Sequence, residues 1–303
     1  MAEKHVESVG EVLRRQSWAQ NERPAPIVDF PIRQEFQCRN CDDTGYVVRT
    51  RDSHHPDFGK AFLCSNPECP TANEIRERQY RRLFKDSGIP DGYQNFSFQS
   101  FDALPDDLKK GKMAGRLAMQ MYVERKGTPF ALCELYELLP EGRVRDYCYH
   151  LYKDEVQMKQ GVVLAGTNGT GKTGLIASAQ IELVKRGTPV LFMNALGVLG
   201  AIKATYDAGG TSALKDNLKN SNHLFIDEMT FETNEWRRTE MQEILRHRHG
   251  NDLPIVMTTN FTVQEFESTF HSQTATGVLA KAHWLEVGGT VLRHERHSVS
   301  EVF

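Results

Sequence analysis

Short apolar runs alternate with longer, partly polar segments through the second half of the chain. The runs have the length of buried strands, and the longer segments carry apolar residues at helical spacing. Strands are expected at 161–165, 190–193, 224–226 and 255–258, and helices at 112–126, 172–186, 198–206 and 236–249. This alternation is typical of a parallel sheet with helices on both faces, so the sequence predicts an α/β fold.

The first part of the chain follows other patterns. Residues 4–16 place four apolar side chains in a narrow stripe along a helix, which suits packing within its own domain or binding to a partner protein. Prolines predict an extended linker over 21–31, and residues 73–86 predict a charged helix. Segment 128–159 shows no clear period. We expect two domains, 1–85 and 86–303.

The composition is that of an ordinary globular protein. Hydrophobic residues make up 39% and charged residues 25%, and 37 basic against 40 acidic side chains give a net charge of −3. This near-neutral balance limits any nucleic-acid contact to a local surface. No apolar run approaches the roughly 18 residues of a membrane span. The charged start, 1–15, lacks the apolar core of a secretory signal, so we expect a cytoplasmic protein without membrane contact.

The six cysteines fall into two groups. Without an export signal, clustered thiols indicate a metal site in preference to disulfides. Cys38-x2-Cys41 and Cys64-x4-Cys69 predict a structural, tetrahedral Zn²⁺ site, with residues 45–49 as a strand of a zinc ribbon. His54 or His55 could replace one thiol, and the ribbon's partner, protein or nucleic acid, stays open. Cys133 and Cys148 have no assigned role.

A glycine-rich loop stands between a predicted strand and a predicted helix and matches G-x4-G-K-[ST] in full. Glycines let backbone amides face phosphate groups, and the helix N-terminus adds positive charge. The lysine adds a further charge, and the Thr173 hydroxyl can bind Mg²⁺. The predicted phosphate-binding residues are Gly166, Thr167, Asn168, Gly169, Thr170, Gly171, Lys172 and Thr173. ATP with Mg²⁺ is the predicted ligand.

Polar residues follow two further predicted strands. Asp227 and Glu228 end the apolar run at 224–226, at the sheet edge where ligands bind in such folds. Asp227 is expected to hold Mg²⁺, and Glu228 to polarise the attacking water as a general base. Asn260 ends the run at 255–258 and is either a turn residue or a sensor of the γ-phosphate, if its strand neighbours the other two. The predicted catalytic residues are Glu228, Lys172 and Asn260.

The order of these motifs resembles the AAA+ helicase loaders of the DnaC/DnaI type and the related IstB-like transposition helper ATPases. The resemblance covers most of residues 79–260. It includes residues 87–90 and 95–98, the phosphate loop, and residues 201–206, 226–228 and 258–260, and residues 9–13 are similar to the start of a DnaC-type loader.

The resemblance implies a P-loop AAA+ ATPase domain after a small N-terminal zinc-binding helical and ribbon region. It also implies that the N-terminal region binds a DnaB-type replicative helicase. It further implies that the ATPase domains self-assemble and help to place single-stranded DNA in the helicase ring. The positions that match the family's DNA contacts are Tyr206 and Trp236, with Lys203, Arg237 and Arg238 available for phosphates. Tyr206 could equally be a packing residue at a helix end.

The sequence departs from the family where an arginine usually acts on the neighbouring subunit's nucleotide. Residues 276–283 carry Gly277 and Lys281 instead, and lysine does not reproduce arginine's planar fork. Lys281, Arg248 and Arg293 are the candidates for this group. Three functions therefore stand: an ATP-dependent helicase loader, a transposition helper ATPase, and a nucleotide-gated adaptor with little hydrolysis. The similarity of residues 9–13 and the zinc region favour the loader.

Overall fold

The computed structural model describes residues 36–134, 157–207, 213–230 and 234–292. The predicted helix at 4–16, the linker at 21–31, Cys148 and Arg293 lie outside these residues. The chain divides into two compact units, 1–72 and 73–303. The predicted domain boundary between residues 85 and 86 stays a prediction.

The described part of the first unit is built around four cysteines. Strands β1 (Tyr46–Val48) and β2 (Ala61–Leu63) pair antiparallel, with Val47 opposite Phe62. The cysteines and Ala72 form the buried core of this unit, and only Val47 and Leu63 pack against it as partly buried apolar residues. So small an apolar core is typical of domains that depend on a metal or on disulfides for their stability.

The second unit contains a five-stranded parallel sheet. Its order is β4 (Leu191–Asn194), β5 (Leu224–Asp227), β6 (Ile255–Thr259), β3 (Gly161–Ala165) and β7 (Ala282–Glu286). Every pair of neighbouring strands is parallel. Strand β6 therefore lies between β5 and β3, so the ends of the three strands with candidate site residues are adjacent. The predicted α/β class with a parallel sheet is confirmed.

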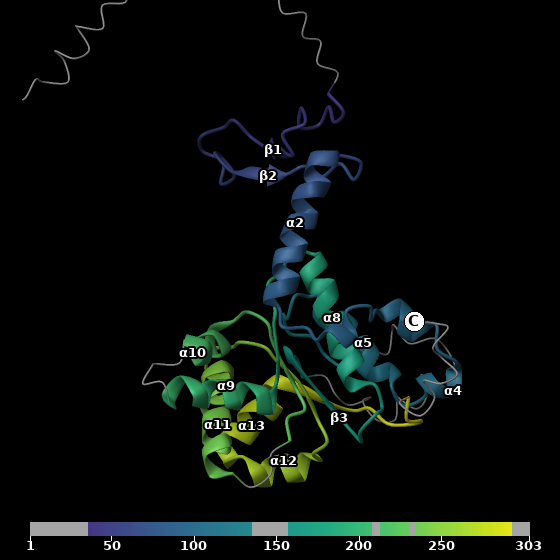
Figure 1. Cartoon of the computed structure of the whole chain (residues 1–303), viewed down its shortest axis with the longest axis vertical. Helices are drawn as coiled ribbons and strands as arrows, with labels where there is room; N and C mark the ends of the chain where they lie inside the picture. The colour runs from purple at the N-terminus through teal and green to yellow at the C-terminus, as the bar shows by residue number, and fades with distance from the viewer. Residues whose placement is uncertain (1–35, 135–156, 208–212, 231–233, 293–303) are drawn as a thin grey trace, which may run out of the picture. The chain divides into compact units, whose positions relative to one another are not determined.

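Helices cover both faces of the sheet (Figure 1). The helices of the described residues are α2 (Pro70–Asp86), η1 (Asp91–Tyr93), α3 (Phe98–Asp102), α4 (Asp106–Lys109), α5 (Met113–Glu124), α8 (Lys172–Lys185), α9 (Ala195–Asp207), α10 (Ala213–Asn220), α11 (Glu235–Gly250), α12 (Val263–Thr269) and α13 (Ser272–Lys281). Helices α5 and α8 contribute to one core, and α9, α10, α11, α12 and α13 to the other.

Alternate residues of the strands divide between the two cores. In β3, Val162 and Leu164 join the core with α5 and α8, while Val163 joins the opposite core. This division follows from the two-residue period of a strand. Because both faces are covered, β3 is buried throughout, which explains its continuous apolar sequence.

The helices and strands predicted within the described residues are present, with their ends shifted by a few residues. Helix α9 begins at Ala195, three residues before the predicted start at 198, because the side chain of Asn194 accepts hydrogen bonds from the Leu196 and Gly197 amides. Sequence reasoning missed β2, η1, α3, α4, α10, α12, α13 and β7. In β7 the buried His283 interrupts the apolar pattern; its Nε2 lies 2.7 Å from the Phe130 carbonyl oxygen.

Among the described residues, no helix combines the length and the hydropathy that a membrane crossing requires.

Candidate nucleotide site and metal centre

The predicted phosphate loop connects β3 to α8, at the carboxyl edge of the sheet. Lys172 is the first residue of α8 and is 7% exposed. Its Nζ donates hydrogen bonds to the carbonyl oxygens of Gly166 at 2.7 Å and Thr167 at 2.8 Å. Nζ also donates to Asn260 Oδ1 at 3.1 Å. The amine therefore lies inside its own loop, where phosphate oxygens can replace these acceptors.

The charge of Lys172 is set by competing effects. Burial lowers the pKa of Lys172, and the nearby carboxylates of Asp227 and Glu228 oppose that shift. Two acids beside one buried amine favour its charged form. With three oxygen atoms accepting hydrogen bonds from Nζ, the surroundings favour the ammonium form at the point where the phosphates of a nucleotide are expected.

Two glycines of the loop hold conformations that other residues rarely adopt. Gly166 has φ +143°, and a Cβ there would lie 2.3 Å from the Val287 carbonyl oxygen. Gly171 has φ +95°, and a Cβ there would lie 2.9 Å from the Leu292 side chain. Backbone strain and close approach both require glycine at these positions. The spacing of the motif therefore has a steric cause in this fold, in addition to its expected role with phosphate.

Asp227 ends β5 and lies beside Thr173 of α8. Thr173 Oγ1 donates to Asp227 Oδ1 at 3.0 Å, and Thr258 Oγ1 donates to the same oxygen at 2.5 Å. Burial raises the pKa of Asp227, while the two hydroxyl hydrogen bonds offset part of the rise. Hydroxyl and carboxylate oxygens are the ligands that Mg²⁺ takes from proteins. The two predicted Mg²⁺ ligands are therefore brought together.

Glu228 follows Asp227 in the left-handed region, with φ +53°. Its amide donates to Thr258 Oγ1 at 2.9 Å, which fixes the turn after β5. Asn194 Nδ2 donates to Glu228 Oε2 at 2.8 Å. Sequence reasoning missed Asn194, although its place directly after an apolar run is the signal that identified Asp227 and Asn260.

Asn260 follows β6, which pairs with β3 on one side and β5 on the other. Besides its bond from Lys172, its Nδ2 donates to Asn168 Oδ1 at 2.8 Å. The condition set for a phosphate-sensing role, that this strand lies beside the other two, is met. Asn260 is thus in contact with the loop that carries the predicted phosphate ligands.

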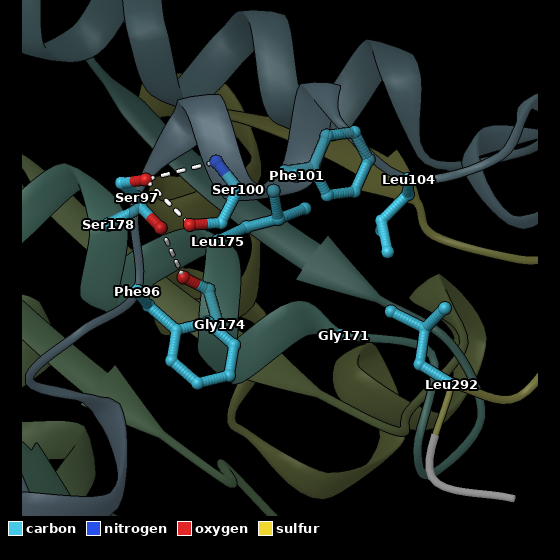
Figure 2. Close-up of a pocket in the computed structure, with 10 residues that line it drawn as sticks. All are labelled: Phe96, Ser97, Ser100, Phe101, Leu104, Gly171, Gly174, Leu175, Ser178 and Leu292. Atoms are coloured by element: carbon cyan, nitrogen blue, oxygen red, sulfur yellow. Dashed lines mark hydrogen bonds between the residues drawn. The ribbon is translucent and has the colours of Figure 1, made fainter. Parts of the chain in front are cut away.

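A small apolar pocket adjoins the phosphate loop (Figure 2). It has a volume of about 40 Å³. The Phe96 ring packs directly on α8, since a Cβ on Gly174 would meet it at 2.7 Å. Leu292 points into the pocket from the C-terminal side. None of these contacts was predicted, because they join segments far apart in the sequence. The lining residues are Phe96, Ser97, Ser100, Phe101, Leu104, Gly171, Gly174, Leu175, Ser178 and Leu292.

The structure excludes Arg248 as a group that reaches a neighbouring subunit. Its side chain is fully buried, and its guanidinium donates to the carbonyl oxygens of Leu218, Ser221 and Pro254. Lys281 is half exposed and pairs with Asp252. Gly277 lies under His249, because a Cβ there would come within 2.6 Å of the His249 ring. Helix α13 therefore offers Lys281, and no arginine, for a contact between subunits.

The predicted DNA-binding residues differ in their exposure to solvent. Tyr206 and Lys203 of α9 are exposed, and residue Tyr206 is 40% accessible. The Tyr206 hydroxyl accepts from Lys215 Nζ at 3.4 Å. Trp236 is half-buried and packs against the core formed with α11. The last turns of α9 thus expose an aromatic ring of the kind that stacks on bases and a basic group of the kind that contacts phosphates.

A second candidate centre is the cysteine cluster of the first unit. The sulfur atoms of Cys38, Cys41, Cys64 and Cys69 all lie within 4.8 Å of one another, and all four residues are buried. Their number and spacing fit a tetrahedral metal site. His54 and His55 are exposed and are not part of the cluster, so the alternative in which a histidine replaces one thiol is wrong.

Hydrogen-bond donors surround the sulfur atoms. Asn66 Nδ2 donates to Cys38 Sγ at 3.3 Å, Asn40 Nδ2 to Cys64 Sγ at 3.2 Å, and the Ala72 amide to Cys69 Sγ at 3.4 Å. The Asn66 hydrogen bond is the main cause that lowers the pKa of the Cys38 thiol to about 6, whereas burial raises the pKa of the Cys41 thiol to about 12. Donors aimed at sulfur stabilise thiolates, the form that binds a metal. The donor set and its surroundings therefore fit a metal ion.

The parallel sheet, with the phosphate loop, Asp227 and Asn260 together at its carboxyl edge, is the arrangement of a P-loop nucleotide-binding domain. Residues 152–300, just under half of the chain, match the model of the IstB-like ATP binding protein family. The expected resemblance to DnaC-type loaders and IstB-like proteins is confirmed.

Two relatives show the extent of the similarity. The replicative helicase loader DnaC of Escherichia coli K12 is 26% identical over 195 residues, which covers 63% of this chain and 66% of DnaC. The phage-like element PBSX protein XkdC of Bacillus subtilis 168 is 25% identical over 275 residues, with 87% of this chain and 85% of XkdC covered. The chain is therefore homologous to DnaC, and it spans just under two thirds of that relative.

Among solved structures, domain III of the Thermotoga maritima replication initiation protein DnaA is similar in fold. It has a TM-score of 0.50 and 14% identity, and the match covers 71% of this chain and 75% of that chain. The DnaI structure matches with a TM-score of 0.48 and 21% identity over 70% of this chain and all of that one. At this identity, the DnaA match supports the fold alone.

Proposed function

We propose that this protein is an ATP-dependent loader of a DnaB-type replicative helicase onto single-stranded DNA during DNA replication. The observation that carries the proposal is the site at the ends of β3, β6 and β5, in a domain homologous to the replicative helicase loader DnaC. In this proposal the site binds ATP. The homology to DnaC supports helicase loading as the process that ATP binding controls.

In the proposed site, the amides of residues 166–173 and the ammonium of Lys172 bind the β- and γ-phosphates. The Thr173 hydroxyl and the Asp227 carboxylate, whose oxygens are 3.0 Å apart, would hold Mg²⁺, which would offset the negative charge of the phosphates. Phosphate replaces the carbonyl oxygens that Lys172 contacts without ligand. Asn260, already bonded to Lys172, then reports whether the γ-phosphate is present.

Hydrolysis depends in this proposal on Glu228 as the general base. A carboxylate can take a proton from water only when its oxygens are free to accept one. Asn194 holds one of these oxygens at 2.8 Å, and its own oxygen caps α9, the helix that carries Tyr206. A movement of α9 on binding DNA therefore has a direct path to the base.

The test of hydrolysis is ATP turnover with and without single-stranded DNA. Glu228→Gln is expected to abolish turnover while ATP still binds, because the amide cannot act as a base. Glu267→Gln removes an exposed carboxylate elsewhere and is the matched control. Normal turnover in Glu228→Gln would show that the base is another group.

The N-terminal region, residues 1–85, is proposed as the helicase-binding part, with Zn²⁺ at the four cysteines. Support comes from the exposed apolar side chains of its ribbon, Tyr46 and Val48, which are 43% and 62% accessible. Exposed apolar groups on so small a ribbon suit a protein contact. The proposed DNA contacts are Tyr206 and Lys203, with Trp236 less accessible, and the ATPase domains self-assemble.

The loader proposal is tested with the hexameric helicase encoded in the same genome. Co-purification of the two proteins is expected, followed by ATP-dependent loading onto a single-stranded DNA circle, read as unwinding of an annealed strand. Lys172→Ala is expected to block loading. Failure of the wild-type protein to bind or load that helicase would overturn the proposal.

Two alternatives rest on specific observations. The family model is that of IstB-like proteins, which favours a transposition helper. Such a protein is expected to form ATP-dependent filaments on duplex DNA and to engage a transposase. Helix α13 offers no arginine among its described residues, which favours an adaptor that binds ATP with little hydrolysis. Duplex filaments would decide for the first, and ATP binding without turnover in the presence of DNA for the second.

A further inference from the structure

The chain after β7 passes over the phosphate loop. We call residues 287–292 the C-terminal strap. The Val287 amide donates to the Ala165 carbonyl oxygen at 2.7 Å, and the Leu292 amide donates to the Gly169 carbonyl oxygen at 2.9 Å. The strap is therefore hydrogen-bonded at one end to the last residue of β3 and at the other to the middle of the loop.

Side-chain and backbone packing reinforce these two contacts. A Cβ on Gly166 would lie only 2.3 Å from the Val287 carbonyl oxygen, so the backbone of the strap packs directly against this glycine. The Leu292 side chain packs on Gly171 in the same way, and Figure 2 shows it beside this residue in the apolar pocket. Gly166 and Gly171 bound the phosphate loop. A shift of the strap therefore changes the conformation of the loop itself.

The middle of the strap is held by a buried lysine. Lys112 precedes α5 and is 0% exposed, and its Nζ donates to the Thr290 carbonyl oxygen at 3.0 Å. Among the described residues, no carboxylate lies within 4 Å of this ammonium. Burial lowers the pKa of Lys112. A buried cation with no carboxylate among its described neighbours is costly, so stability alone does not account for a lysine here.

The backbone next to Lys112 also meets the strap. The Gly288 amide donates to the Gly111 carbonyl oxygen at 3.0 Å. A Cβ on Gly289 would lie 2.3 Å from the Lys110 carbonyl oxygen, so the two backbones are in direct contact. Residues 110–112 thus form a fixed base against which the strap is held.

We infer that Lys112 is a positioning residue of the nucleotide site: its ammonium fixes the C-terminal strap, and the strap fixes the phosphate loop in the conformation that binds ATP. The inference rests on the proposed ATP binding and adds a residue that does not itself touch the nucleotide. Its chain of contacts runs from Lys112 to Thr290 and, through the strap, to Gly169 and Gly171.

The experiment measures ATP affinity and stability of the full chain in parallel. A fluorescent ATP analogue is displaced by Mg·ATP, and urea gives the unfolding midpoint. Lys112→Met is expected to weaken ATP binding by about tenfold, the effect of one charge-assisted hydrogen bond. Its urea midpoint is expected to stay or rise, because an apolar side chain of similar size replaces a buried charge. Lys85→Met, at an exposed position outside the strap and its base, is the control and is expected to change neither quantity.

A second variant tests the path through the strap. Leu292→Ala is expected to weaken ATP binding, and the double variant with Lys112→Met is expected to lose less than the product of the two effects, because both act through one segment. The inference would be overturned if the Lys112→Met protein bound ATP as tightly as the wild type. It would also be overturned if its urea midpoint fell in parallel with the loss of ATP affinity. A wild-type protein that binds no ATP would instead overturn the proposed function.

Discussion

Substitution of Arg248 tests whether this residue of α11 stabilises the fold through its buried hydrogen bonds. Replacement by methionine keeps most of the side-chain volume but removes the guanidinium that donates to Leu218 O at 2.8 Å, Ser221 O at 2.8 Å and Pro254 O at 2.7 Å. Each buried acceptor left without a donor costs about 1–3 kcal/mol. The removed charge no longer has to be desolvated, which offsets part of the loss. We therefore expect Arg248→Met to lower the free energy of unfolding by about 3–5 kcal/mol.

The loss is a large share of the ~5–15 kcal/mol by which domains are usually stable. Urea denaturation followed by circular dichroism measures it. Arg246→Met is the matched control, since Arg246 is exposed on the same helix, and its change should stay within about 0.5 kcal/mol. A role at a neighbouring subunit predicts the opposite pattern, with normal stability and ATP turnover lost in mixed assemblies. An Arg248→Met protein as stable as the wild type would therefore refute the structural role.

The other predictions concern the nucleotide site, pH and the metal. Lys172→Ala is expected to abolish ATP binding in a calorimetric titration, whereas Lys185→Ala, exposed at the end of the same helix, should bind normally; unchanged affinity in Lys172→Ala contradicts the site. Burial lowers the pKa of His223 to about 4, from 6.5 in an unfolded chain. The unfolded chain therefore binds a proton that the native state does not, and stability falls as the pH falls below about 6.5. Between pH 7 and 5 the wild type should lose about 2 kcal/mol more than His223→Gln by urea denaturation, and equal slopes would count against the shift. Elemental analysis is expected to find about one zinc per chain, absent in a Cys38→Ser, Cys41→Ser variant that still binds ATP, and a metal-free wild type would refute the zinc site.

Sequence patterns were informative where a residue's role is set by its neighbours in the chain. The phosphate loop, the acidic pair and Asn260 each follow an apolar run, and the parallel sheet places all three at one edge. Asn194 follows a fourth such run and could have been found by the same reasoning. Thr262 and Glu265 form a capping box that marks the start of α12, a helix signal that was present in the sequence but not used.

Other features had no local signal. Strand β7 contains a buried histidine, and its place beside β3 depends on pairing between segments far apart in the sequence. Arg248 was a reasonable candidate for a trans-acting group, because a charged residue on a polar helix is usually exposed. Only the approach of α10 and the chain before β6 turns it into a buried donor.

The sequence by itself determined the chemistry of this protein: a phosphate loop, the acids that follow β5, and four thiols with metal-ligand spacing. These depend on residue type and on spacing along the chain, which a sequence states directly. The tertiary structure decided which groups act together. It joined Asn194 to Glu228, buried Arg248, and brought the two cysteine pairs into one cluster. It also placed residues 287–292 against the phosphate loop, where Lys112 donates a hydrogen bond to Thr290. Each of these contacts closes a long loop of chain, and packing of the whole fold, rather than any local preference, selects it.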